Sequence, residues 1–208
     1  MTAGRPEANI LLMSRNPDPA AGGFRVKSGW ATAVLLQGPV ESPRIFDRRT
    51  VELCDPAVPE SRQPYHAAMG MLEEDAAKLQ RRTDLVRRAA ERSVRELLQA
   101  YQSLGCAPRT AALVVGSVID PAAIANPHIR AHALEGQLFR TVLEEVLKAA
   151  GLACAMILEK KVYARAAAAL GQTEDEVKRT VSALGRSIGG SWRADDKLAA
   201  AAAWMRLA

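Results

Sequence analysis

Residues 110–119 are Thr-Ala-Ala-Leu-Val-Val-Gly-Ser-Val-Ile, a continuous apolar run that is typical of a strand covered on both faces. Asn126 and Pro127 then provide an N-cap residue and a proline at the first helical position, and Gly151 closes a helix predicted to end near residue 150. A second short apolar run follows at residues 153–158. This order predicts two parallel strands joined by a helical crossover, and therefore an α/β fold.

Three further strands are predicted before this unit. Residues 8–14 indicate a short strand, followed by a Pro/Gly loop over residues 16–23. Residues 25–36 indicate a longer strand, and residues 44–53 alternate in part between apolar and polar side chains. Three strands in succession predict an antiparallel meander on one side of the sheet.

Helical periodicity dominates the rest of the chain. Between residues 65 and 104, apolar side chains recur at spacings of three, four, seven or eight residues, which predicts one long helix or two stacked ones. A short alanine-rich helix is expected to end at Gly171, and Thr173 with Glu176 forms a capping box that starts the next helix. The terminal helix is predicted over residues 194–207.

Composition favours one compact domain. The chain has 208 residues, 49% of them hydrophobic and 25% charged, which suits a single core. The cysteines are few and widely spaced, as expected in a reducing cytoplasm. The apolar run at residues 10–13 is too short for a signal peptide or membrane span, so no membrane association is predicted. We divide the chain into a partly flexible N-terminal segment, residues 1–23, and a single domain, residues 24–208.

Two groups of charged residues are candidates for function. Asp195 and Asp196 stand at the start of an almost wholly apolar helix, where acids require a metal ion, a cation or the free amides of the helix. The formal net charge is +5, and a basic surplus lies between residues 160 and 193. This surplus could face phosphates, although a solvated surface is the commoner explanation of such charges. The candidates for phosphate contacts are Lys160, Lys161, Lys178 and Arg179.

The order of elements resembles the ribonuclease H-like fold, and in particular the RuvC-type Holliday-junction resolvases. The resemblance covers about four-fifths of the chain, and its most similar features lie between residues 126 and 203. These features are Gly136-Gln137, the strand at 156–159, Lys160-Lys161-Val162, the Gly171 turn, Glu176-Val177-Lys178 and residues 194–199. Nearer the N-terminus, Gly29-Trp30-Ala31 and Thr32 look like the second strand of such proteins. The implied fold is a three-stranded antiparallel meander plus two parallel strands with flanking helices.

The resemblance also implies a metal centre. The family holds two divalent metal ions with an Asp from the first strand, a Glu from the fourth and two acids from the last helix. The second helix acid corresponds to Asp196, whereas its companion corresponds to Arg193, beside Asp195. The fourth-strand position lies near residues 116–117, where Asp120 is the nearest acid. The first-strand position corresponds to Ser14 or Gly22, with Asp18 as a remote substitute.

We therefore expect a RuvC-like protein with a degenerate catalytic centre, which binds DNA or RNA or acts as a scaffold, with no cofactor. Asp120, Asp195 and Asp196 would be remnants of the catalytic set. One alternative is an Mg²⁺- or Mn²⁺-dependent endonuclease on branched DNA or RNA, in which Asp18 joins these acids as a metal ligand. Another is a structural protein that forms a homodimer through residues 65–104, as the resemblance implies, without a nucleic-acid role.

Histidines provide a further pattern. His128, His132 and Glu135 lie on one side of the predicted crossover helix, and two imidazoles one turn apart can share a zinc ion. Because the sequence indicates no further ligand, helix-surface histidines are the expected interpretation, and phosphate capture by His128 and Arg130 at the helix start is an alternative. The chain has no Walker loop, no GxGxxG after a strand and no GxSxG elbow, which argues against the enzyme classes built on them.

Overall fold

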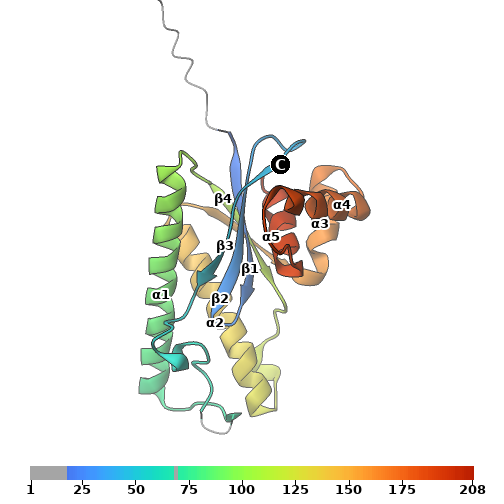
Figure 1. Ribbon diagram of the computed structural model, residues 1–208. Helices are drawn as coiled ribbons and strands as arrows, with labels where there is room; N and C mark the ends of the chain where they lie inside the picture. Colours follow the sequence, from blue (N-terminus) through green and yellow to red (C-terminus); the bar gives the residue numbers. More distant parts are fainter. Residues whose placement is uncertain (1–17, 68–69) are drawn as a thin grey trace, which may run out of the picture.

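The computed structural model describes residues 18–67 and 70–208, and its centre is a five-stranded mixed sheet (Figure 1). The strands lie in the order β3-β2-β1-β4-β5. Their bounds are β1 Ala20–Lys27, β2 Trp30–Gln37, β3 Arg44–Glu52, β4 Thr110–Val115 and β5 Ala153–Leu158. The first three pair antiparallel, β4 is parallel to β1, and β5 is parallel to β4.

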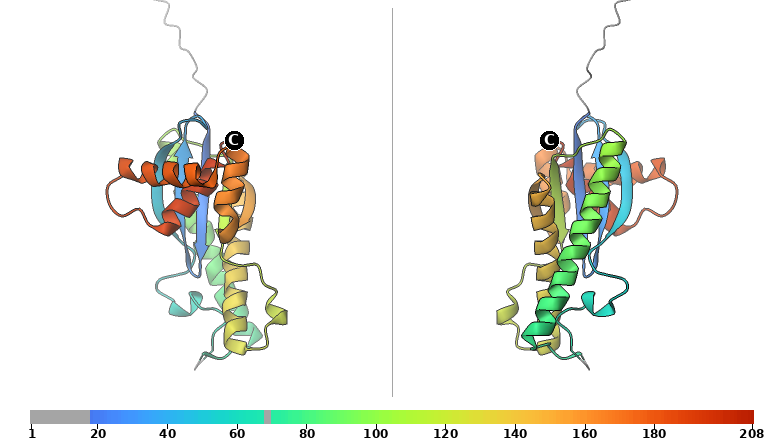
Figure 2. Two further views of the ribbon diagram at one scale, coloured as in Figure 1. Left: turned by 90° about the vertical axis from the view of Figure 1, so that its right-hand side faces the viewer. Right: turned by 90° about the vertical axis from the view of Figure 1, so that its left-hand side faces the viewer.

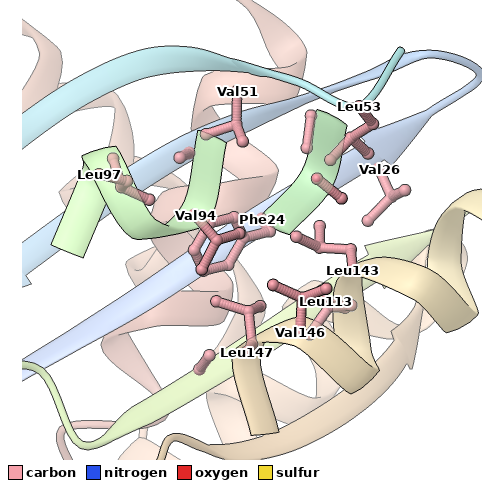
Figure 3. Close-up of a cluster of buried hydrophobic side chains, with 14 of the residues drawn as sticks. Phe24, Val26, Val51, Leu53, Val94, Leu97, Leu113, Leu143, Val146 and Leu147 are labelled. Atoms are coloured by element: carbon pink, nitrogen blue, oxygen red, sulfur yellow. The ribbon is translucent and has the colours of Figure 1, made fainter. Parts of the chain in front are cut away.

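Helices cover both faces of the sheet, which gives three layers (Figures 1 and 2). Their bounds are α1 Ala76–Ser103, α2 Pro127–Ala149, α3 Val162–Leu170, α4 Glu174–Leu184 and α5 Ala194–Trp204. One face packs against α1 and α2 through a core that includes Phe24, Leu113 and Leu143 (Figure 3). The other face packs against α3, α4 and α5. No helix in the described part of the chain is long and apolar enough to cross a membrane.

Helix α5 lies unusually close to the sheet. It contains a run of buried alanines from Ala199 to Ala203, so its backbone can approach strand β1 closely. At Gly23 of β1, an added Cβ would lie 1.9 Å from the carbonyl oxygen of Ala199, a distance that no real side chain tolerates. The absence of a side chain at this position therefore sets how α5 lies on the sheet, and so where its first residues point.

Several elements that were predicted from capping residues and turn residues are confirmed. Asn126 accepts a hydrogen bond from the backbone nitrogen of Ile129 and caps α2 as predicted, and β5 covers residues 153–158. Gly171 ends α3 in the left-handed conformation. The capping box at the start of α4 is also confirmed, because Thr173 and Glu176 exchange backbone-to-side-chain hydrogen bonds.

The N-terminal strands needed correction. Residues 25–36, predicted as one strand, are the end of β1 and most of β2, separated by a turn in which Gly29 has a φ of +87°. The loop predicted over residues 16–23 is strand from Ala20 onward, because pairing with β2 and β4 outweighs the low strand propensity of its small residues. The strand predicted at residues 8–14 lies outside the described residues.

Two other boundaries differ from the prediction. Strand β4 ends at Val115 instead of residue 119, and residues 116–120 form a connection before a short 3-10 turn. The region 65–104 forms a helix only from Ala76, where Asp75 is the N-cap and accepts hydrogen bonds from two backbone nitrogens. In both regions the apolar pattern extends beyond the regular element into the connecting segment.

Candidate functional site

The candidate site lies where the parallel strands end. Because β1, β4 and β5 run in the same direction, their carboxyl ends meet at one edge of the sheet, which is where α/β folds bind ligands. Arg25 and Lys27 come from the end of β1, Glu159 directly follows β5, and Asp195 lies in the first turn of α5. We call these four residues the strand-end cluster.

The strand-end cluster is held together by ion pairs. Arg25 is only 4% exposed, and its guanidinium pairs with the Glu159 carboxylate. Its Nε lies 3.6 Å from Oδ1 of Asp195, and Nζ of Lys27 lies 3.4 Å from the same oxygen. Two cations therefore neutralise two carboxylates at this edge of the sheet.

A cavity of about 210 Å³ adjoins the strand-end cluster and is bordered by basic side chains. Arg25 and Lys27 line it from β1, Ser117 from the end of β4, and His132 and Arg140 from α2. Arg140 is 9% exposed and donates to the carbonyl oxygen of Ser117 at 3.2 Å; burial lowers the pKa of its guanidinium. Arg25 and Lys27 are paired with the acids of the strand-end cluster, whereas Arg140 has no acidic partner among the described residues, so the cavity carries a net positive charge that favours an anionic ligand.

Asp196 points away from Asp195 and has a structural partner. Its carboxylate accepts two hydrogen bonds from Arg48 of β3, from Nε at 2.6 Å and from Nη2 at 3.0 Å. It also accepts from the backbone nitrogen of Arg193 at 2.7 Å, which caps α5. The hydrogen bond to Asp196 raises the pKa of Arg48. Asp195 and Asp196 therefore serve different cations and do not converge on a common point.

The other two aspartates also have local partners. Asp18 pairs with Arg44 at 2.9 Å and precedes β1, roughly 20 Å along the strand from Arg25. Asp120 caps a short 3-10 turn by accepting from the backbone nitrogen of Ala122 at 3.0 Å. Within residues 18–67 and 70–208, no three acidic side chains converge as metal ligands. The four-aspartate centre considered from the sequence is not assembled.

The predicted basic residues divide into two sets. Lys160 and Lys161 are exposed in the 3-10 turn directly after β5, next to Glu159 of the strand-end cluster. Lys178 and Arg179 are exposed on α4, where Lys178 lies 3.6 Å from Glu174 and 3.5 Å from Asp175. Only the lysines after β5 therefore adjoin the candidate site.

Three basic residues of the site were missed at the sequence level: Arg25, Lys27 and Arg140. A signal for two of them exists, since Arg25 and Lys27 are two residues apart in a strand and share one face. Their significance depends on knowing that β1 ends at Lys27, and the predicted boundary hid that end inside one long strand. Arg140 is one basic residue of a long helix, and only the fold shows that it is buried.

The long helix uses its apolar stripe within the chain. Val86, Val94, Leu97 and Tyr101 of α1 are buried in the core that α1 shares with the sheet and α2. The exposed positions of α1 are largely charged, including Arg88 and Arg92. The apolar stripe of α1 is therefore covered by the protein's own core, and the surface that α1 leaves for a dimer interface is largely charged.

Comparison with known proteins identifies the fold. No known family profile and no curated protein matches the sequence. Among solved structures, the chain is similar to Thermus thermophilus RuvC in complex with a Holliday junction substrate, with 12% identity, a TM-score of 0.53 and coverage of 90% of this chain and 91% of that one. A second structure of Thermus thermophilus RuvC gives 11% identity, a TM-score of 0.50 and coverage of 89% and 92%. For the yeast mitochondrial Holliday junction resolvase Ydc2 the identity is 13% and the TM-score is 0.49, with coverage of 92% of this chain and 79% of that one.

The mixed sheet and its flanking helices therefore form a ribonuclease H-like fold, as the sequence predicted. Within this class the fold is RuvC-like, because the similarity to RuvC extends over nearly the full length of both chains.

Proposed function

We propose that this RuvC-like protein binds the phosphate backbone of DNA or RNA at the strand-end cluster and does not cleave it. The observation that carries the proposal is the position of Arg25 and Lys27, which occupy the end of β1 and pair with Asp195. A RuvC-type centre would need a metal-binding carboxylate from this strand.

Electrostatics favour binding over metal-dependent cleavage. A divalent cation between Asp195 and Glu159 would face the buried guanidinium of Arg25 at short range, and like charges at that distance repel. A phosphate group has the opposite preference, because Arg25, Lys27 and Arg140 line the adjoining cavity. Lys160 and Lys161 extend the basic surface outward from β5.

The choice of nucleic acid follows from fold similarity. One of the similar RuvC structures is a complex with a Holliday junction substrate, so a four-way DNA junction is the first ligand to test. Linear duplex DNA, single-stranded DNA and duplex RNA complete the set. These ligands separate recognition of a branched structure from general attraction to phosphates.

Binding can be measured by fluorescence anisotropy as a function of salt. Lys160→Ala/Lys161→Ala should weaken binding and reduce the slope of log K against log[salt] by about 1.8, since each lost phosphate contact removes about 0.9. Arg88→Ala/Arg92→Ala removes the same charge from the exposed surface of α1 and is the matched control. Equal losses in both variants would contradict a site at the strand ends.

Cleavage is tested with the same ligands in Mg²⁺ or Mn²⁺. We expect no cutting. Asp195→Asn is a better test than Asp196→Asn, because Asp196 is a buried partner of Arg48 and its replacement would also disturb the fold. Cleavage that disappears in Asp195→Asn would establish the endonuclease alternative. Absence of binding to every nucleic acid would favour the structural alternative, in which case sedimentation would test for a homodimer.

A further inference from the structure

We propose that His66, His128 and His132 form a zinc site, separate from the carboxylates of the strand-end cluster. The chain contains three histidines, and the fold brings all of them together from two distant segments. His66 lies in the connection between β3 and α1, whereas His128 and His132 lie on the first turns of α2. One ring nitrogen from each lies within 4.8 Å of the others.

The hydrogen bonds of the rings determine which nitrogens are free. Nδ1 of His66 lies 2.7 Å from Oε1 of Glu135, and Nδ1 of His132 lies 3.5 Å from Oε2 of the same carboxylate. Nδ1 of His128 lies 3.1 Å from the carbonyl oxygen of Gly70. Carboxylate and carbonyl oxygens only accept, so Nδ1 of His66 and Nδ1 of His128 are donors, and Nε2 of each of these two rings keeps its lone pair. The longer contact of His132 is not a hydrogen bond and does not fix the tautomer of that ring.

The spacing of the rings fits a common metal ion. The Nε2 atoms of His128 and His132 are 3.2 Å apart, so without a metal Nε2 of His132 can donate to Nε2 of His128, and a bound cation would take the place of that proton. Two nitrogens bound to one tetrahedral zinc ion are expected to lie about 3.3 Å apart, given zinc–nitrogen bonds near 2.0–2.1 Å. The side chain of His66 is only 9% exposed, and its Nε2 has no hydrogen-bond partner among the described residues. A cation bound by all three nitrogens satisfies each lone pair.

Glu135 supplies the negative charge that such a site requires. Its side chain is fully buried, and Oε2 makes no hydrogen bond within the described part of the chain. A buried carboxylate is costly unless it is compensated, and a bound cation behind two imidazoles compensates it. A carboxylate that receives the Nδ1 hydrogen of a histidine ligand is a common feature of zinc sites, where it orients the ring and raises its basicity.

The residues around His66 are held by neighbouring groups before any metal binds. Arg82 of α1 donates to the carbonyl oxygens of Pro64 and His66, each at 3.1 Å. The guanidinium of Arg82 also lies 3.3 Å from the buried Glu73 carboxylate. The metal would therefore bind a largely formed site and tie this connection to α2.

The ligand set selects the metal. Three imidazole nitrogens suit Zn²⁺ and other late transition metals, whereas Mg²⁺ and Mn²⁺ prefer oxygen ligands. His128 and His132 are exposed, so water can supply the fourth ligand. His132 also lines the cavity beside the strand-end cluster, which places the ion at the cavity wall.

The test uses the full chain after removal of metal with a chelator. Calorimetry with ZnCl₂ should show uptake of one ion per chain, and Co²⁺ should give the visible absorption of a tetrahedral site without a thiolate charge-transfer band. His66→Ala and His132→Ala should each abolish stoichiometric uptake. His132 is half exposed, so its variant should fold normally, as circular dichroism will check. Glu135→Gln should retain the ion but weaken its binding by about 10- to 100-fold.

Two variants serve as controls for other ligands. Asp195→Asn removes an acid of the strand-end cluster, and Cys154→Ser removes a partly exposed thiol; both should bind zinc as the wild type does. The proposal is overturned if the folded wild type takes up no zinc, if His132→Ala binds it unchanged, or if either control loses it. Nucleic-acid binding is measured separately, so failure of one proposal does not entail failure of the other.

Discussion

Asp196 and Glu135 are both buried carboxylates, and the structure partners them in different ways. Asp196 is 1% exposed and receives two hydrogen bonds from a guanidinium and one from a backbone nitrogen. Glu135 is fully buried, but its neighbours are two imidazole rings, and one of its oxygens makes no hydrogen bond among the described residues.

This difference distinguishes an acid that stabilises the fold from an acid that supports a ligand site. The charge of Asp196 is compensated by the chain itself, so this acid needs no ion. The charge of Glu135 is not compensated unless the imidazoles carry a cation. The resemblance to a nuclease draws attention to Asp196. A search for buried polar atoms without hydrogen bonds draws it to Glu135 instead.

The largest expected effect is on the ion pair of Asp196. Arg48→Ala leaves a buried carboxylate without its cation and should reduce the free energy of unfolding by about 3 kcal/mol. Arg87→Ala breaks an ion pair of which both side chains are about half exposed, and should cost less than about 0.5 kcal/mol. Urea unfolding measures both. Similar losses would mean that the two pairs are equivalent and that Asp196 is not a structural acid.

The corresponding prediction for Glu135 concerns metal-dependent stability. Zinc at 100 times its dissociation constant should stabilise the wild type by about 2.7 kcal/mol. At the same zinc concentration, Glu135→Gln should gain only about 0.4–1.4 kcal/mol, because its affinity is 10- to 100-fold lower. Thermal unfolding with and without zinc provides the measurement. An equal gain in both proteins would show that Glu135 does not support the imidazoles.

The exposed N-cap of α4 allows the stability contributed by a helix cap to be compared with that contributed by a buried ion pair. Thr173→Ala removes the cap of α4 and should cost about 1 kcal/mol, clearly less than Arg48→Ala. Hydrogen bonds from Thr173 lower the pKa of Glu176 below its ordinary value of 4.5. The unfolded chain therefore binds more protons, so the contribution of Glu176 is complete above about pH 4.5 and is lost as pH falls through its lowered pKa.

That pH dependence can be measured directly. The stability difference between the wild type and Glu176→Gln should be constant between pH 7 and 6 and should shrink below about pH 4.5. A difference that grows with acidity would contradict the capping role.

The smallest expected effect is at Asp195. Asp195→Asn should reduce stability by about 0.5 kcal/mol or less, because its ion pairs with Arg25 and Lys27 are longer than 3.3 Å and Arg25 keeps Glu159. Urea unfolding, compared with Arg48→Ala, measures the contrast between adjacent acids. A loss as large as that of Arg48→Ala would make the strand-end cluster a structural ion-pair network.

Sequence reasoning succeeded where the signal is local. Asn126 with Pro127, and Thr173 with Glu176, lie next to the helix starts that they specify, so those starts were predictable. The start of β1 was not, because residues 20–23 are alanine and glycine and become strand only through pairing with β2 and β4.

The sites depend on contacts between distant residues, and for that reason they were largely hidden. Arg25 meets Glu159 across 134 positions of sequence, and His66 meets Glu135 across 69. The pattern of His128, His132 and Glu135 on one helix was visible, but the third imidazole comes from an irregular connection that no periodicity marks. The sequence did offer one hint of a metal site: only three histidines occur in the chain, and two of them, His128 and His132, are one helical turn apart.

The contact between Gly23 and α5 also constrains how this chain can diverge in evolution. With the carbonyl oxygen of Ala199 at 1.9 Å from any Cβ, position 23 admits one amino acid as long as the helix stays where it is. Substitutions that enlarge the buried alanines of α5 would lift the helix and carry Asp195 away from β1 with it. Homologues are therefore expected to vary freely in the acids and bases at the strand ends while retaining glycine here, because the glycine is fixed by packing and not by the chemistry of the site.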